Sequence, residues 1–195
     1  MLKATWKKRT SDRYLRPLRE QWLAAVPEQA TLLDVGCGTG DFLRLAGPKL
    51  EAGWGIDLDH KLIQYARTSA KEQGLDHLQF TDQGFSPNNL PPQKVDIASA
   101  SLFFHVLRWS KAVDLLKLLA QCGSEIWVAA LEPPQRWQEK VSLWLDQRFS
   151  GHFFHYQTYM AEGGMEALIE ATGLHTLEKE TTFDRSIAWY QLEGK

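Results

Sequence analysis

The stretch LLDVGCGTGDF, residues 32–42, decides the fold of this chain. Its apolar beginning predicts a buried strand over 31–35. Gly36, Gly38 and Gly40 follow this strand, and an amphipathic segment comes next. Glycines let the backbone turn sharply and approach a ligand closely. A strand, a glycine turn and a helix in this order predict helical N–H groups that face a bound carboxylate or phosphate.

Short apolar runs alternate with helical spacing along most of the chain. Strands are expected over 31–35, 52–57, 77–81, 95–99 and 125–131, and helices over 41–46, 60–73, 112–121 and 164–172. The last two strands, 174–183 and 187–192, are joined at Asp184-Arg185. Residues 151–159 show no clear periodicity. The order predicts an α/β fold: a doubly wound, mostly parallel seven-stranded sheet with an antiparallel C-terminal strand.

An acidic residue ends the second predicted strand and bears on the choice of cofactor. Asp57 lies 21 positions after Gly36, where a carboxylate accepts hydrogen bonds from a ribose diol. The dinucleotide fingerprint requires glycine or alanine where this chain has Asp41. A carboxylate there would repel a pyrophosphate, whereas a positively charged sulfonium nucleoside would gain from acidic neighbours. The residues therefore favour the sulfonium cofactor.

The sequence DVGCGTG, residues 34–40, resembles motif I of class I S-adenosylmethionine-dependent methyltransferases. The resemblance covers roughly residues 30–131 and, more loosely, the C-terminal strands. It is most similar to the small-molecule enzymes that include the ubiquinone/menaquinone type. The resemblance implies a Rossmann-like fold and an enzyme that uses S-adenosylmethionine and releases S-adenosylhomocysteine.

The same resemblance assigns cofactor contacts to the ends of the first four strands. Asp34 would meet the amino group of the cofactor, and Asp57 its ribose. Leu58 would lie against the adenine, and Asp82 would accept from the adenine amino group. The strand 96–99 resembles motif IV, whose C-terminal end faces the transferred methyl. The full predicted set is Asp34, Gly36, Cys37, Gly38, Gly40, Asp57, Leu58, Asp82, Gln83 and Ser99.

Methyl transfer also requires a group that removes a proton when the acceptor is a hydroxyl or an amine. His105 follows the fourth strand and is the first candidate base, with a packed structural histidine as the alternative. His155 and Tyr156 are weaker candidates, since either can be structural. Neither Cys37 nor Cys122 has the spacing of a metal ligand, so no metal site is expected.

The chain is expected to have an appended arm and a lid. Residues 1–30 form a predicted basic helical arm that covers the site, although a solvated helix face is the alternative. Residues 31–195 form the predicted methyltransferase domain, and a helical, aromatic insertion at 133–162 is the expected acceptor lid.

The composition limits which partners and which cellular compartment are expected for the protein. The formal net charge is −2, which provides no overall electrostatic footprint for nucleic acid. The signatures of DNA methyltransferases are absent after the fourth and fifth strands. A small-molecule methyl acceptor is therefore the expected partner. RNA or protein methylation, cofactor binding without catalysis and, more distantly, nicotinamide-dependent chemistry remain alternatives. No apolar run is long enough to span a membrane and no secretory signal is evident, so a cytoplasmic location is expected. The oligomeric state is left open.

Overall fold

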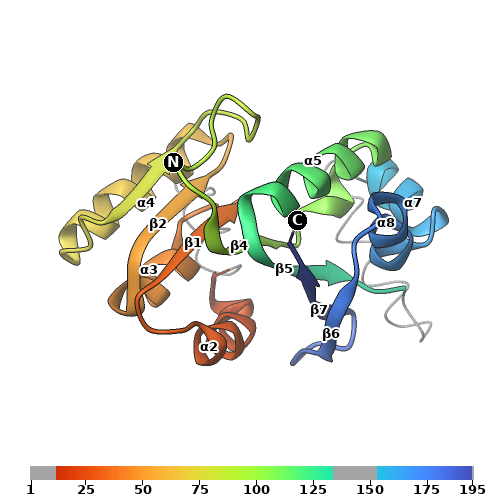
Figure 1. The fold of residues 1–195 in the computed structure, drawn as a ribbon, viewed down its shortest axis with the longest axis horizontal. Helices are drawn as coiled ribbons and strands as arrows, with labels where there is room; N and C mark the ends of the chain where they lie inside the picture. The colour runs from red at the N-terminus through yellow and green to blue at the C-terminus, as the bar shows by residue number, and fades with distance from the viewer. Residues whose placement is uncertain (1–11, 134–152, 195) are drawn as a thin grey trace. The chain divides into compact units, whose positions relative to one another are not determined.

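The computed structural model describes residues 12–133 and 153–194 (Figure 1). Its strands form one seven-stranded sheet in the order β3-β2-β1-β4-β5-β7-β6. This confirms the predicted α/β fold. The strands are β1 Ala30–Val35, β2 Leu50–Ile56, β3 Leu78–Thr81, β4 Val95–Ser101, β5 Gly123–Leu131, β6 Thr176–Thr181 and β7 Ile187–Glu193. The helices are α2 Arg16–Ala25, α3 Asp41–Ala46, η1 Gly47–Lys49, α4 His60–Glu72, η2 Phe104–Val106, α5 Trp109–Cys122, α7 Phe153–Ala161 and α8 Gly164–Thr172.

The chain divides into two compact units, Met1–Ile97 and Ala98–Lys195. In the first unit, β1 pairs parallel with β2, and β2 pairs parallel with β3. Gly55 on β2 makes room for a large side chain of β3, because a Cβ there would lie 2.5 Å from Cδ1 of Phe80. The carboxyl ends of β1, β2 and β3 therefore meet at one edge, as the sequence predicts.

Local signals determine where α4 begins and ends. The Asp59 carboxylate accepts from the backbone N–H groups of Lys61 and Leu62, which are unpaired in the first turn of the helix. Gly74 follows the helix with φ of +69°, a conformation in which glycine carries no steric penalty. The helix expected over 60–73 is confirmed, and its end is one residue earlier, at Glu72.

The helix α2 packs its apolar face inside the first unit. Leu18 and Trp22 are buried, and the Trp22 ring meets the Phe42 ring edge to face at 5.2 Å between centroids. The part of the predicted arm that is described thus packs against α3. Residues 1–11 of the arm and residues 134–152 of the expected lid lie outside the described residues.

The second unit contains the antiparallel end of the sheet. The strand β7 pairs antiparallel with both β5 and β6, which confirms the predicted finish. The Trp127 and Trp189 rings pack edge to face at 5.3 Å between centroids. Residues 153–161, which show no periodicity in the sequence, form the helix α7. Its buried face holds Tyr156 and Tyr159, three positions apart, while the exposed Phe154 obscures the amphipathic pattern.

Asp96, at the start of the strand that resembles motif IV, links β4 to β1. Asp96 is the second residue of β4, and Oδ2 of its carboxylate accepts from the backbone N–H and the hydroxyl of Thr31, each at 2.7 Å. The Asp96 N–H donates back to Thr31 Oγ1 at 2.9 Å. Thr31 lies near the beginning of β1, so Asp96 lies at the amino end of the strands. Asp96 therefore ties β1 and β4 together at the end of the strands opposite the glycine turn.

We predict that Asp96→Asn lowers the free energy of unfolding by about 1 kcal/mol at pH 7, a value reduced for solvent exposure. The hydrogen bonds from Thr31 lower the pKa of Asp96 from its ordinary value of 3.8. The stabilisation is therefore present above pH 3.8 and is lost as the pH falls through the lower folded pKa. Urea unfolding of both proteins between pH 7 and pH 3 should show the gap closing at acid pH.

Thr31→Val provides the matched control for this prediction. In that background the hydroxyl donor is gone, so the further cost of Asp96→Asn should be smaller. An equal cost in both backgrounds, or a gap independent of pH, would contradict the role of the pair.

Candidate functional site

The turn after β1 has a backbone that only glycine adopts readily. Gly36, Gly38 and Gly40 have φ values of +76°, +55° and +68°. A Cβ at Gly40 would lie 2.5 Å from Cε1 of Phe80, so this position also requires the absence of a side chain. A Cβ at Gly38 would meet no atom within 4 Å. The space beside Gly38 is therefore open, which leaves room for a ligand to approach the backbone.

The end of β2 holds this turn through hydrogen bonds. The Gly36 and Cys37 N–H groups both donate to the carbonyl of Ile56, at 2.7 and 3.1 Å. The Gly38 N–H donates to Oδ2 of Asp57 at 2.9 Å. Three consecutive amides of the turn are thus fixed by Ile56, the last residue of β2, and by Asp57, which follows it. The turn and the acid predicted to bind ribose form one structural unit.

Asp57 retains the capacity to accept from a ligand. Its Oδ1 accepts from the Asp59 N–H at 2.8 Å, and each carboxylate oxygen has two lone pairs. Both oxygens are thus oriented by the backbone, and each keeps an acceptor site. This is the arrangement expected of an acid that accepts hydrogen bonds from a ribose diol.

Negative charge gathers around the turn. Burial raises the pKa of the Cys37 thiol well above its ordinary value, and the nearby Asp34 and Asp57 carboxylates raise it further. The thiol is therefore protonated at neutral pH and is a weak nucleophile. The same two carboxylates favour a positively charged group beside the turn.

The segment after β3 lies close to the segment after β2. Leu58 is 78% exposed although it is apolar, and a Cβ at Gly84 would lie 3.5 Å from its Cδ2. The carboxylate of Asp82 pairs with Nδ1 of His60 at 2.5 Å, and this hydrogen bond lowers the pKa of Asp82. Arg67 lies 3.9 Å from the other oxygen of Asp82. An exposed apolar side chain near an oriented carboxylate suits a planar base with an amino group.

Sequence analysis names Asp82 as an expected adenine contact but does not single out His60, which pairs with it in the structure. The pairing joins positions 22 apart in the chain, and no local pattern marks it. Gln83, also in the predicted set, lies next to Asp82 on the surface, and its N–H donates to Thr81 Oγ1 at 3.3 Å.

The candidates in the second unit are mostly buried. Ser99 is fully buried within β4. His105 is buried in η2, and its ring meets the Tyr159 ring at 6.5 Å between centroids. Tyr156 lies on the buried face of α7, and burial raises the pKa of its hydroxyl. His155 precedes it and lies beside the exposed Phe154.

Two hydroxyl groups of the second unit lack a hydrogen-bond partner within the described residues. They are the hydroxyls of Ser101, the last residue of β4, and Tyr159 in α7, and both atoms are buried. An unsatisfied buried hydroxyl calls for a water or a ligand group. Sequence analysis did not single out Ser101, because a serine at the end of a strand is unremarkable in sequence.

Asp41 changes the argument about cofactor choice. Its Oδ2 accepts from Nη1 of Arg19 at 2.6 Å, and its Oδ1 lies 3.4 Å from Nη2 of Arg44. The negative charge that would repel a pyrophosphate is therefore paired with two arginines. The repulsion is weaker than the sequence indicates, and the argument for a sulfonium cofactor depends more on Asp34 and Asp57.

The fold and the turn are those expected of an α/β domain that binds a nucleoside cofactor at the carboxyl edge of a parallel sheet. A family model described as a methyltransferase domain matches residues 32–123. The glycine motif and this match agree on a methyltransferase domain over residues 32–123. A comparison with curated protein sequences finds no significant match.

Solved structures show the same fold at low sequence identity. Magnesium protoporphyrin IX methyltransferase from Synechocystis PCC 6803, with bound S-adenosylmethionine, has a TM-score of 0.64 and 13% identity over 95% of this chain and 80% of that one. The N-methyltransferase NodS from Bradyrhizobium japonicum, in complex with S-adenosylhomocysteine, has a TM-score of 0.65 and 15% identity over 94% and 86%. An O-methyltransferase family protein from Burkholderia thailandensis has a TM-score of 0.67 and 15% identity over 94% of this chain, which spans only 57% of that protein.

In the described ranges 12–133 and 153–194, the longest apolar stretch of any helix falls short of what crossing a bilayer requires.

We predict that Asp57→Asn weakens the binding of S-adenosylhomocysteine by roughly 1–3 kcal/mol, because charged hydrogen bonds to the ribose and to the Gly38 amide are lost together. Isothermal titration calorimetry measures this change. An unchanged affinity would remove Asp57 from the site.

Asp59→Ala is the matched control, since it alters an acid two residues away. It removes the cap of α4 and should lower the free energy of unfolding by about 1 kcal/mol. The affinity of the folded protein for the cofactor should stay within about twofold. A loss as large as that of Asp57→Asn would assign the effect to general destabilisation.

Proposed function

We propose that the protein transfers a methyl group from S-adenosylmethionine to a small-molecule acceptor by in-line displacement. The observation that carries the proposal is the open glycine turn, whose Gly38 amide is held by Asp57 at the carboxyl edge of the sheet. The cofactor supplies an activated methyl on a positively charged sulfur and a good leaving group. The protein must then bind, orient and exclude water.

The first unit supplies the cofactor contacts in this proposal. Asp57 binds the ribose, and Leu58 covers the adenine while Asp82 accepts from its amino group. Asp34 meets the amino group of the methionine moiety. The negative potential of Asp34 and Asp57 favours the sulfonium over the neutral sulfur of the product, which assists product release.

The second unit supplies the acceptor contacts. His105 accepts the proton of the acceptor, with His155 and Tyr156 as secondary candidates. Its edge contact with the Tyr159 ring restrains the His105 imidazole within a buried setting. A restrained, water-poor base is what an in-line transfer to a hydroxyl or an amine requires.

The proposed organisation assigns residues 1–30 to an arm that covers the cofactor and residues 31–195 to the catalytic domain, with 133–162 as the acceptor lid. The packing of α2 through Leu18 and Trp22 supports a docked arm.

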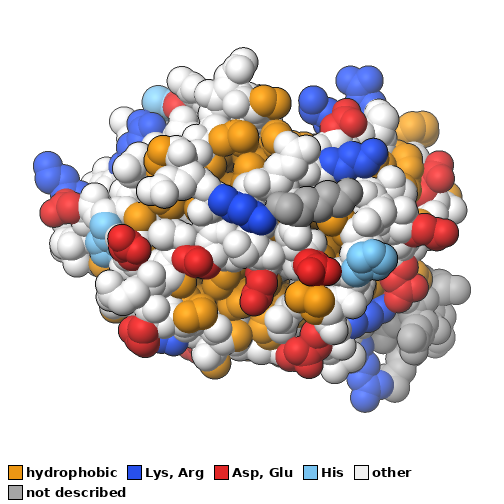
Figure 2. Space-filling model, in the orientation of Figure 1, with side chains coloured by type: hydrophobic (Ala, Val, Ile, Leu, Met, Phe, Trp, Pro, Cys, Tyr) orange, Lys and Arg blue, Asp and Glu red, His pale blue; other side chains and the backbone are white. Residues whose placement is uncertain are grey.

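A small acceptor suits the surface better than a nucleic acid does. On the face shown in Figure 2, the acidic and basic side chains of the described residues are interspersed. Nucleic-acid binding requires a concentrated basic surface that tracks phosphates. Several structural neighbours are named for small-molecule methylation, among them the porphyrin enzyme.

The test is a transfer assay with radiolabelled S-adenosylmethionine. The purified protein is incubated in parallel with a panel of phenols, amines and carboxylates, with total RNA, and with denatured protein extract. Label in a small-molecule fraction, with stoichiometric S-adenosylhomocysteine, supports the proposal. Label confined to RNA or protein would assign the alternative acceptor class. Tight cofactor binding without transfer to any fraction would leave a non-catalytic binding protein.

We predict that His105→Gln lowers kcat by about 10²-fold or more while the affinity for S-adenosylhomocysteine changes by less than about threefold. The amide keeps a polar group of similar size, so the protein should remain folded. Single-turnover assays and calorimetry on the same preparation measure the two quantities.

The comparison with His155→Gln on α7 distinguishes the two candidate bases: a change in kcat of less than about threefold keeps the role with His105, whereas a loss as large as that of His105→Gln would assign a role to His155. Parallel losses of activity and thermal stability in His105→Gln would instead identify His105 as a packing residue.

A further inference from the structure

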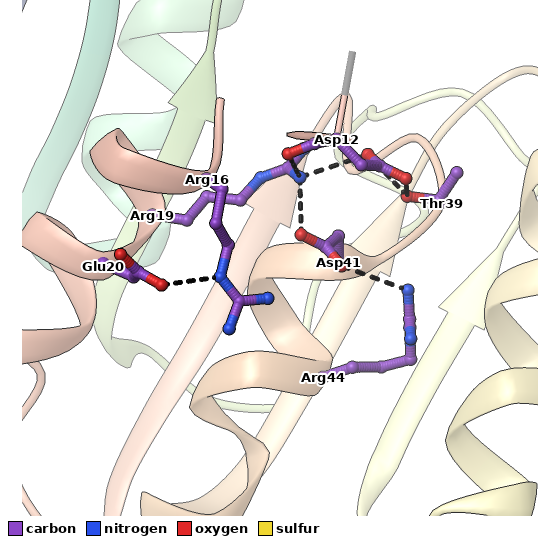
Figure 3. Close-up of polar contacts among 7 residues, drawn as sticks. All are labelled: Asp12, Arg16, Arg19, Glu20, Thr39, Asp41 and Arg44. Carbon is purple, nitrogen blue, oxygen red and sulfur yellow. Dashed lines mark hydrogen bonds and ion pairs between the residues drawn. The ribbon is translucent and has the colours of Figure 1, made fainter. Parts of the chain in front are cut away.

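A cluster of charged side chains joins the N-terminal segment, residues 12–25, to the glycine turn, residues 36–40 (Figure 3). Nη1 of Arg19 donates to Oδ2 of Asp41 at 2.6 Å and to Oδ1 of Asp12 at 3.1 Å. The Thr39 hydroxyl donates to the same Asp12 carboxylate at 3.0 Å. Arg44 reaches the second oxygen of Asp41 at 3.4 Å. One guanidinium therefore connects α2, the first residue of α3 and the residue that contacts the turn.

This cluster is sheltered from solvent, unlike another ion pair on the same helix. The side chains of Arg19, Asp41 and Asp12 are 13%, 17% and 25% exposed. Arg16 and Glu20, drawn beside them in Figure 3, are 47% and 58% exposed. Water screens an exposed ion pair, so that pair contributes little to the stability of the fold. A partly buried pair that also makes hydrogen bonds contributes more to stability.

The turn is therefore held from two sides. On the β2 side, Asp57 accepts from the Gly38 amide. On the other side, Asp12 accepts from the hydroxyl of the next residue, Thr39, and Arg19 fixes Asp12 in place. Asp41, immediately after the turn, is fixed by the same guanidinium. The positive φ values at Gly38 and Gly40 leave this backbone with alternative conformations, so its side-chain tethers select one of them.

We propose that Arg19 is a positioning residue for the cofactor-binding turn, and that docking of the N-terminal segment and binding of the cofactor stabilise each other through it. The inference rests on the proposed placement of the cofactor at the glycine turn. Linkage makes the coupling reciprocal: if the docked segment tightens cofactor binding, the cofactor tightens docking by the same factor. Without Arg19, Asp12 loses the arginine that pairs with it, Asp41 keeps the longer contact to Arg44, and the segment is attached to the turn through the Thr39 hydroxyl with no arginine to fix Asp12 in place.

A simple charge effect predicts the opposite sign. Removing Arg19 makes the surroundings of the turn more negative, which would strengthen the binding of the sulfonium cofactor and leave the uncharged sulfur of S-adenosylhomocysteine nearly unaffected. A positioning role weakens the binding of both ligands alike, because both use the same turn. Measuring the affinity for both ligands therefore distinguishes a positioning role of Arg19 from a simple charge effect.

The experiment measures Kd for S-adenosylmethionine and S-adenosylhomocysteine by calorimetry on the full chain and its variants. Arg19→Ala should weaken both ligands about tenfold, within the usual range of coupling between sites. Arg19→Lys keeps the positive charge but lacks the planar guanidinium that bonds both carboxylates. It should therefore weaken the binding of both ligands less than Arg19→Ala does. Arg16→Ala, three residues earlier on the same helix, is the matched control and should stay within twofold.

Thr39→Val keeps the test valid if Arg19→Ala does not fold. It removes only the hydroxyl that contacts Asp12, and it should weaken both ligands about threefold. S-adenosylhomocysteine should also slow tryptic cleavage after the exposed Arg13 in the unmodified chain, and less so in Thr39→Val. Equal cleavage rates with and without the ligand would overturn the coupling.

The remaining outcomes separate this inference from the proposed function. Normal binding by the unmodified chain, with unchanged affinity in both Arg19→Ala and Thr39→Val, would overturn the role of Arg19 alone. Tighter binding of S-adenosylmethionine only would replace it with the charge effect. No binding of either ligand by the unmodified chain would overturn the cofactor site and this inference with it.

Discussion

The hydrogen bond from the Gly38 amide to Asp57 is the contact on which the rest of the site depends. It joins a turn whose backbone has positive φ at three positions to the residue that follows β2. Such a turn has few side chains of its own to hold it, and glycine is conformationally permissive. Its shape must therefore come from its neighbours: the Ile56 carbonyl, the Asp57 carboxylate and the Asp12 carboxylate. The acid that would bind the ribose is thus also the acid that shapes the turn.

The charges around the turn divide into two groups with different tasks. Asp12 and Asp41 are paired with Arg19, so they act as structural tethers and contribute little net field. Asp34 and Asp57 raise the pKa of the buried Cys37 thiol, which shows that their negative potential reaches the turn. A sulfonium nucleoside is favoured by this second group. The sequence argument against a pyrophosphate relied on the charge of Asp41. A sequence does not show that this carboxylate is already paired with arginine.

Much of the fold could be predicted because its signals are local. Glycine, apolar periodicity and strand spacing lie within short windows, and they give β1, α3 and α4 with their ends within a few residues. Contacts that join distant positions leave no such pattern. The Thr31–Asp96 pair spans 65 positions and the Arg19–Asp41 pair spans 22. The helix α7 lies within the predicted helical, aromatic insertion, but its bounds could not be predicted: exposed Phe154 lies among aromatic residues, so apolar character does not mark the buried face.

The same physics explains why the cofactor could be inferred and the acceptor could not. Cofactor binding requires backbone geometry that glycine supplies, and glycine at fixed spacing is visible in a sequence. In the proposed function, acceptor binding would depend on side chains such as His105, and the buried Ser101 and Tyr159 hydroxyls are further candidates from β4 and α7. None of these residue types requires a particular spacing to do its work. Three proteins that share this fold are named as a porphyrin methyltransferase, an N-methyltransferase and an O-methyltransferase family protein. The fold therefore does not determine the acceptor. Acceptor identity therefore has to be established by direct transfer assays, and the two buried hydroxyls of the second unit that still require hydrogen-bond partners are candidate acceptor contacts for mutation.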